Sequence, residues 1–294
     1  MIYVFGDSMT KYFWPTWPTW YEKYSGEKII NLAYPGYGTG NLYWNLIDQL
    51  PNIKEGDKVF MMWTQCHRSV EWYDRDWLDK RDVLGFFPSS DGKLWYGDDF
   101  LGLYRTHPDH EHSFTDGIVK SFSLILSCQQ LLESKNIDYQ MIFAFNPWLD
   151  NRYTWKPKFK INIHKWFENE KIKKSEIEHA NKILKISPVK NLINLINWNT
   201  FFEPPEDPFD PSAYRNFWDL HTTNIKEYVV AQHPVDPHPS PLINHDLAVK
   251  MLGGKQNHHR KLAIELAQEA ATMLETQEWK ENEYTAPPET PLID

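Results

Sequence analysis

Short apolar runs that alternate with amphipathic stretches dominate the hydrophobic pattern of the chain. Five of these runs have turn residues nearby, as expected of buried parallel strands: residues 2–5, 28–32, 58–63, 139–145 and 192–197. Apolar side chains recur at helical spacing in residues 39–50, 116–134, 173–186, 241–253 and 258–277. Because strands that alternate with helices form parallel sheets covered on both faces, we expect an α/β fold. Its form would be a three-layer αβα sandwich around a central five-stranded parallel sheet.

Three stretches lack this regular pattern and are rich in Trp, Tyr, Pro, Asp and His: residues 66–115, 146–172 and 200–235. Each follows an expected strand. In a parallel sheet such loops gather at the carboxyl edge, where they would line or cover a pocket. We interpret residues 1–277 as a single domain with these insertions, and residues 278–294 as an extended, Pro-rich tail.

The composition limits the classes of partner. The chain has 294 residues, 41% of them hydrophobic, which is typical of a globular protein with a full core. A formal net charge of −9, with both signs interspersed, disfavours nucleic-acid phosphates and anionic membrane surfaces. No apolar run approaches the roughly 20 residues of a membrane span. We expect a small-molecule or glycan substrate, no nucleic-acid partner and no membrane partner; the sequence indicates no oligomeric state.

The two cysteines, Cys66 and Cys128, are far apart and form no disulfide framework, which fits a reducing compartment. The first expected strand starts almost at residue 1 and leaves no room for a signal peptide. These features favour a cytoplasmic protein, and they are compatible with a phage-encoded protein that acts on a host glycan.

The first candidate site is Gly6-Asp7-Ser8, which directly follows the first expected strand. A strand that ends in a turn of small residues can present a nucleophile at the carboxyl edge of an α/β sheet. The alternative is a strand-to-helix turn in which the serine only caps a helix.

The second candidate site lies in "VDPHPSPLINHDLAVKML", residues 235–252. Ser240 and Pro241 predict a helix start, so His238 would lie on a rigid loop before that helix. Asp236 is two residues earlier, and in an extended segment its carboxylate would share a side with the imidazole and orient it. The alternative is a Pro-rich turn with both side chains in water. His245 is interpreted as a surface or packing residue.

Together these motifs resemble the SGNH, or GDSL, hydrolase family, whose closing block is similar to "DPHPSPLINH". The two motifs lie near the two ends of the chain, so the resemblance spans roughly residues 1–277. It implies a flavodoxin-like fold, with Ser8 as nucleophile, His238 as general base and Asp236 as the acid that orients it. It also implies no cofactor and no metal.

The resemblance further implies an oxyanion hole that includes the backbone N–H of Ser8. The family's second block contributes a glycine, and "NLAYPGYGTGN" offers Gly36 as first choice and Gly38 as second. A Gly-rich turn before a helix would explain the same residues.

The chain departs from the family pattern in two places. The third block is usually Gly-x-Asn-Asp, but here it reads "MMWTQCHR". Gln65 stands in place of the asparagine, and Thr64, His67 and Arg68 are possible substitutes. In addition, Asp236 and His238 are separated by one residue instead of two. Should Asp236 face away, the substitute orienting acids are Asp219 and Asp246.

The expected substrate contacts are Asp7, Trp63, Thr64, His67 and Trp148. Tryptophans stack on sugar rings, and the proposed pocket loops contain Trp63, Trp72, Trp77, Trp95, Trp148 and Trp155. The segment "WPTWPTWYEKY", residues 14–24, is interpreted either as a rigid edge of the core or as a further stacking surface.

The leading hypothesis is therefore a serine esterase acting on a carbohydrate ester such as an O-acetyl group. The alternatives are a catalytically weak or inactive carbohydrate-binding protein on the same fold, and a sugar O-acetyltransferase. Zinc binding by "HPDHEH", residues 107–112, and a Cys66-His67 thiol nucleophile are both disfavoured, the latter because adjacent side chains on a strand end point apart.

Overall fold

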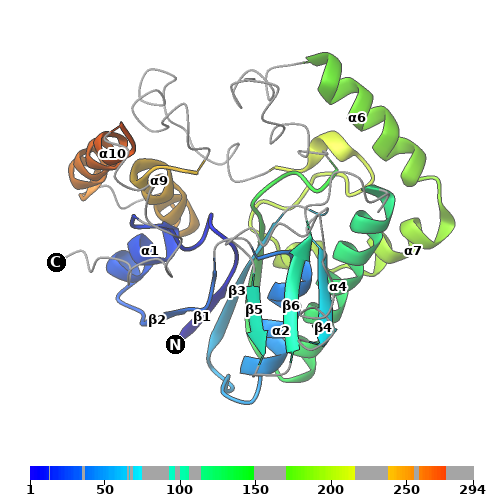
Figure 1. Ribbon diagram of the computed structural model, residues 1–294, viewed down its shortest axis with the longest axis horizontal. Coiled ribbons are helices and arrows are strands. Elements are labelled where there is room, and N and C mark those ends of the chain that lie inside the picture. Colours follow the sequence, from blue (N-terminus) through cyan, green and yellow to red (C-terminus); the bar gives the residue numbers. More distant parts are fainter. Residues whose placement is uncertain are drawn as a thin grey trace.

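The structure is a computed structural model. It describes residues 1–12, 14–34, 37–64, 66, 69–74, 93–96, 100–105, 114–148, 170–215, 238–254 and 258–275. Within these residues, the main sheet has four parallel strands in the order β2-β1-β3-β7 (Figure 1). They are β1 (Ile2–Phe5), β2 (Ile29–Asn31), β3 (Lys58–Trp63) and β7 (Asp138–Phe143).

Helices cover both faces of this sheet (Figure 1). Side chains alternate along each strand, so Val4 and Phe60 enter a first core while Phe5 and Met61 enter a second. The first core is closed by α1 (Trp17–Ser25), α9 (Pro241–Met251) and α10 (Arg260–Glu275). The second is closed by α2 (Thr39–Gln49), α4 (Phe114–Ser134), α6 (Glu170–Ile183) and α7 (Ser187–Leu195). The expected α/β class, with helices on both sides of a parallel sheet, is confirmed.

The helices α2, α4, α6, α9 and α10 agree with the expected ones to within a few residues, whereas α1 was not expected. Its buried residues Trp17, Trp20 and Tyr24 are spaced three and four apart, Pro18 lies in its first turn, and Gly26 ends it at a φ of 69°. Two short 3₁₀ helices, η2 (Trp198–Thr200) and η3 (Pro211–Ala213), follow α7. No helix in the described ranges has the length and apolar character needed to cross a membrane.

The expected fifth strand, residues 192–197, is wrong. Most of it belongs to α7, in which Val189 and Ile193 are buried four residues apart on one helical face. The only addition to the sheet beside β7 within the described residues is a single parallel bridge between Met141 and Phe201.

The first insertion contains a small sheet that was not expected. It is antiparallel, with the order β4-β6-β5: β4 (Ser69–Asp74), β5 (Lys93–Tyr96) and β6 (Phe100–Arg105). β4 contacts α2, which places this sheet beside the second helical layer (Figure 1). Most of the other two insertions and the expected tail lie outside the described residues.

Candidate active site

The strand order places Ser8 at the point where the connections of the sheet change direction. α1 links β1 to β2 on one face of the sheet, and α2 links β2 to β3 on the other. The region outside the carboxyl ends of β1 and β3 is therefore a topological switch point, the place where open α/β sheets bind ligands. The turn that carries Ser8 follows β1 directly at this edge.

Ser8 occupies the start of a short helical turn. The N–H groups of Thr10 and Lys11 donate to the Asp7 carbonyl, at 2.9 and 3.1 Å, and the Asp7 carboxylate accepts from the Met9 N–H at 2.9 Å. Ser8 is 5% exposed, and within the described residues neither its hydroxyl nor its N–H is engaged in a hydrogen bond. A hydroxyl and an N–H left unpaired at the start of a helical turn suit a nucleophile and an oxyanion donor.

Glycine is required at position 6 by close packing. A Cβ there would lie 2.1 Å from Thr10 Oγ1. The Thr10 hydroxyl in turn contacts the Met62 sulfur on β3 at 3.3 Å. The absence of a side chain at Gly6 thus lets the turn fold back tightly over the ends of β1 and β3.

Thr64, in the segment "MMWTQCHR", contacts the Gly6-Asp7-Ser8 motif. Its hydroxyl donates to the Asp7 carboxylate at 2.5 Å, and both side chains are buried. Asp7 and Thr64 were expected to contact substrate; the structure shows them bound to each other beneath the nucleophile turn. Their observed role is to fix that turn against the end of β3.

The segment that follows this turn contacts the loop that precedes α9. The ring of His238 stacks on the ring of Tyr12, with centroids 3.9 Å apart and planes inclined at 19°. The indole N–H of Trp14 donates to the Pro239 carbonyl at 2.8 Å. Among the described residues no hydrogen bond joins Ser8 Oγ to the His238 ring, so their pairing stays a prediction.

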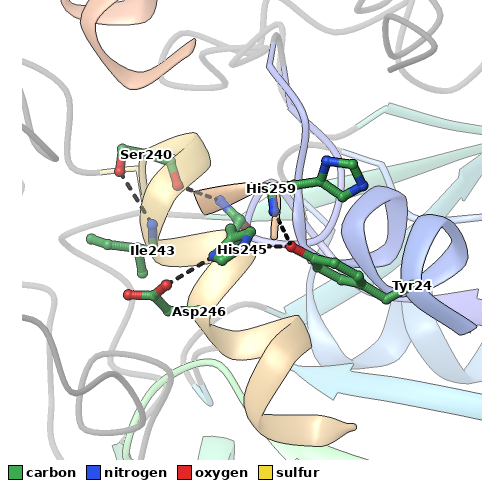
Figure 2. Close-up of polar contacts among 7 residues, drawn as sticks. Tyr24, Ser240, Ile243, His245, Asp246 and His259 are labelled. Atoms are coloured by element: carbon green, nitrogen blue, oxygen red, sulfur yellow. Dashed lines mark hydrogen bonds and ion pairs between the residues drawn. The ribbon is translucent and has the colours of Figure 1, made fainter. Parts of the chain in front are cut away.

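The first turn of α9 fixes the loop that carries His238. Ser240 caps the helix by accepting a hydrogen bond from the Ile243 N–H, which confirms the expected helix start (Figure 2). The Asn244 side chain accepts from the Trp17 N–H at 2.9 Å and donates to the carbonyls of Pro239 and Ser240 at 2.9 and 3.0 Å. One amide thereby ties the His238 loop to the start of α1.

A second polar network joins α1, α9 and the start of α10 (Figure 2). His245 is fully buried; its Nε2 lies 2.7 Å from the Tyr24 hydroxyl and its Nδ1 lies 2.9 Å from Asp246. The backbone N–H of His259 also donates to the Tyr24 hydroxyl, at 3.3 Å. His245 is thus a packing residue and not a surface residue. Asp246, a possible substitute orienter for His238, pairs with His245 instead.

This network shifts two pKa values. Burial raises the pKa of the Tyr24 hydroxyl, and the His259 N–H partly offsets the effect. Burial lowers the pKa of the His259 imidazole, and electrostatic interactions with His258, Lys23 and His245 lower it further. The packing of α10 against α1 and α9 therefore favours a neutral His259.

Several expected site residues lie outside the described residues, and their roles stay predictions: Gly36, Gln65, His67, Arg68, Asp219 and Asp236. Gly38 is described. It precedes α2, and its N–H donates to the Asn41 side chain at 2.7 Å. Because that donor is already engaged, Gly38 is a poor second choice for the oxyanion hole.

Five of the described tryptophans are buried, whereas Trp44 on α2 is 42% exposed. Trp63 and Trp148, expected to contact substrate, are 1% and 0% exposed and belong to the second core. This burial corrects the expectation, because fully enclosed rings offer no face to a sugar. Trp14, Trp17 and Trp20 are buried as well, in agreement with the core-edge interpretation of residues 14–24.

The zinc and thiol motifs that were disfavoured from the sequence lie largely outside the described residues. Within the described ranges, no group of three or more His, Cys, Asp or Glu residues is placed to hold a metal ion. The motif at residues 107–112 lies outside those ranges, and Cys66 is buried and forms no disulfide bond.

Sequence reasoning missed Tyr12 as a site residue. The only available signal was its position four residues after Ser8, within an aromatic segment.

Comparison with known proteins gives no match: no family model fits the chain, and no curated protein and no solved structure is significantly similar to it. The class that the geometry defines is an α/β protein with a candidate site at the carboxyl edge of a parallel sheet.

Proposed function

We propose that the protein is a serine esterase of the SGNH type, with Ser8 as nucleophile, His238 as general base and Asp236 as the acid that orients it. The observation that carries the proposal is the packing of the segment after Ser8 against the His238 loop. The Tyr12 ring stacks on the His238 ring. The Trp14 indole N–H donates a hydrogen bond to the Pro239 carbonyl, 225 residues away in the sequence. The segment that follows the first motif thus contacts the loop that carries His238 of the second motif, which supports the proposal.

In the proposed reaction, Ser8 Oγ attacks the ester carbonyl carbon while His238 takes its proton. The oxyanion accepts hydrogen bonds from the N–H groups of Ser8 and Gly36 and from the Gln65 amide. The ester C–O bond then breaks, and the alcohol leaves with the proton held by His238. A water molecule, deprotonated by His238, attacks the acyl-enzyme and releases the acid, and Ser8 recovers its proton. Asp236 stabilises the imidazolium. These steps need no cofactor.

The geometry around Ser8 supports this assignment without a preformed Ser8–His238 hydrogen bond. Catalytic hydrogen bonds are often long in the free enzyme and shorten in the substrate complex. The Pro239 carbonyl, next to His238, accepts hydrogen bonds from both Trp14 and Asn244, which fixes the backbone directly after His238.

An O-acetylated glycan is the proposed substrate class. With Trp63 and Trp148 in the core, the support for a sugar ligand comes from the other aromatic residues of the insertions: Trp72, Trp77, Trp95 and Trp155.

The test compares the wild type with Ser8→Ala, using Ser127→Ala as control because Ser127 lies on α4 and bonds only its own helix. A fluorophosphonate probe is expected to label the wild type and Ser127→Ala but not Ser8→Ala. Release of acetate from acetylated polysaccharide is expected to fall by about 10⁴-fold or more in Ser8→Ala. Equal release by all three proteins would overturn the proposal.

The second candidate is a carbohydrate-binding protein without catalysis on the same fold. The altered third block and the shorter spacing between Asp236 and His238 favour it. Glycan binding without any probe labelling would select this candidate. An O-acetyltransferase would instead label at Ser8 and transfer acetyl to an added sugar acceptor, which product analysis detects.

A further inference from the structure

The segment between the nucleophile turn and α1 is tightly held. Tyr12 and Trp14 are 2% and 6% exposed and pack together with Ala270 of α10. The Thr16 hydroxyl donates to the Thr10 carbonyl at 2.6 Å and closes the segment into a compact loop. The aromatic rings that follow Ser8 therefore have fixed positions relative to the turn that carries it.

Two contacts from this loop fix the His238 region. The rings of Tyr12 and His238 are nearly parallel, 3.9 Å apart and inclined at 19°. The Trp14 ring packs edge-on against Tyr12, at 4.7 Å and 74°, and its N–H bonds the Pro239 carbonyl. Tyr12 is thus supported from one side by Trp14 and offers a ring face to His238. A stacked imidazole is restricted to the plane that the phenol ring sets.

The stack on Tyr12 would also stabilise the positive charge that His238 acquires when it acts as a general base. When an imidazole takes a proton it becomes a cation, and the face of an aromatic ring attracts a cation. In the proposed reaction, Asp236 would act on the edge of the His238 ring and Tyr12 on its face. The two contacts do not compete for the same atoms.

We infer that Tyr12 is a positioning residue whose ring sets the orientation of the His238 imidazole. Its catalytic meaning rests on the proposed esterase function. Tyr12 acts through His238 and needs no contact with the substrate. The simpler alternative is that Tyr12 only fills space between α9, α10 and the loop.

The experiment measures ring orientation and catalysis separately. NMR follows the ring protons of His238, assigned by their loss in His238→Gln, and hydrolysis of p-nitrophenyl acetate gives kcat and KM. The variants are Tyr12→Leu, which removes the ring face, and Tyr12→Phe, which keeps it. The control is Tyr21→Leu, because Tyr21 is a buried tyrosine of α1 that packs on Phe60.

Protons above an aromatic ring resonate upfield, so the His238 ring signals are expected to move downfield in Tyr12→Leu and to stay near their wild-type positions in Tyr12→Phe. In Tyr12→Leu, kcat is expected to fall about 10²-fold, the cost of a displacement of about 1 Å, with KM little changed. Tyr12→Phe should restore most of kcat. Tyr21→Leu should lower the melting temperature without either effect.

If Tyr12→Leu does not fold, Trp14→Phe gives the second measurement. It keeps a ring against Tyr12 but removes the bond to Pro239, and kcat should fall up to about 10-fold, the value of one hydrogen bond.

Unchanged His238 signals in Tyr12→Leu, or unchanged kcat in both Tyr12→Leu and Trp14→Phe, would overturn the inference while leaving the esterase proposal intact. A wild type that hydrolyses no ester, but whose His238 signals move in Tyr12→Leu, would overturn the proposed function and support the positioning of the ring.

Discussion

At the scale of single residues, the Asp7 carboxylate connects the nucleophile turn to the neighbouring strand. One of its oxygens accepts from the Met9 N–H and the other from the Thr64 hydroxyl. Because Asp7 and Thr64 are both buried, loss of the Thr64 hydroxyl removes a donor from a buried carboxylate, which is costly.

We predict that Thr64→Val lowers the free energy of unfolding by about 1.5–3 kcal/mol, the range for a hydrogen bond to a charged group. Thr39→Val is the matched control: Thr39 is equally buried, but its hydroxyl pairs with the neutral Ser121 hydroxyl at 3.3 Å. That control should lose about 1 kcal/mol or less. Urea denaturation measures both values, and equal losses in the two variants would contradict the assigned role of Asp7.

At the scale of secondary-structure elements, we expect the docking of α10 onto α1 and α9 to weaken in acid. His259, at the start of α10, has a pKa lowered mainly by burial. The unfolded chain therefore binds a proton at this position at a higher pH than the folded protein does. Stability is fully present above the unfolded pKa of about 6.5, and it is lost as the pH falls through the lower folded value.

We predict that the free energy of unfolding decreases between pH 7.5 and pH 5.5 (about one unit either side of the unfolded histidine pKa), and that His259→Gln makes this decrease smaller. Urea denaturation across this range measures the effect. His179→Gln is the control because His179 is exposed on α6. A pH dependence that is the same in the wild type and His259→Gln would show that other groups control acid stability.

Elements whose apolar residues fit only one periodicity could be predicted from the sequence. Elements whose apolar residues fit both a strand and a helix could not. α4 and α10 carry long apolar stripes, and β1 and β3 are short apolar runs beside turn residues. Residues 192–197 are also an apolar run, but the buried pair Val189 and Ile193 has helical spacing, and the run lies on α7. The error arose because a short apolar run fits both a buried strand and a helix face.

At the scale of the whole molecule, the candidate site could be predicted only as two motifs and not as a geometry. Ser8 and His238 are signalled by local sequence. The role of Tyr12 depends on where its ring lies relative to His238, which the path of the intervening chain decides. For the same reason the sequence could not distinguish Trp148 in the core from a tryptophan lining a pocket.

The order of the strands in the sheet predicts which backbone amides are most protected from hydrogen exchange. β3 is paired on both sides, with β1 and β7, and all of its residues except the first are buried. In the described sheet, β2 pairs only with β1, and its residues are half-buried. We predict that backbone amides of β3 exchange hydrogen last and those of β2 earlier. Mass spectrometry of peptides covering the two strands measures this. Equal protection of β2 would contradict its position at the edge.

The contacts of Tyr12 and Trp14 with the His238 loop join segments that are far apart in the sequence. Trp14 and Pro239, for example, are 225 residues apart. During synthesis, the ribosome releases Ser8 long before it makes His238. A nascent chain that has passed β3 can therefore form the turn that carries Ser8 while it lacks the proposed base. If the protein follows the proposed chemistry, hydrolytic activity begins only after translation has passed α9. An unfinished polypeptide would then not hydrolyse esters.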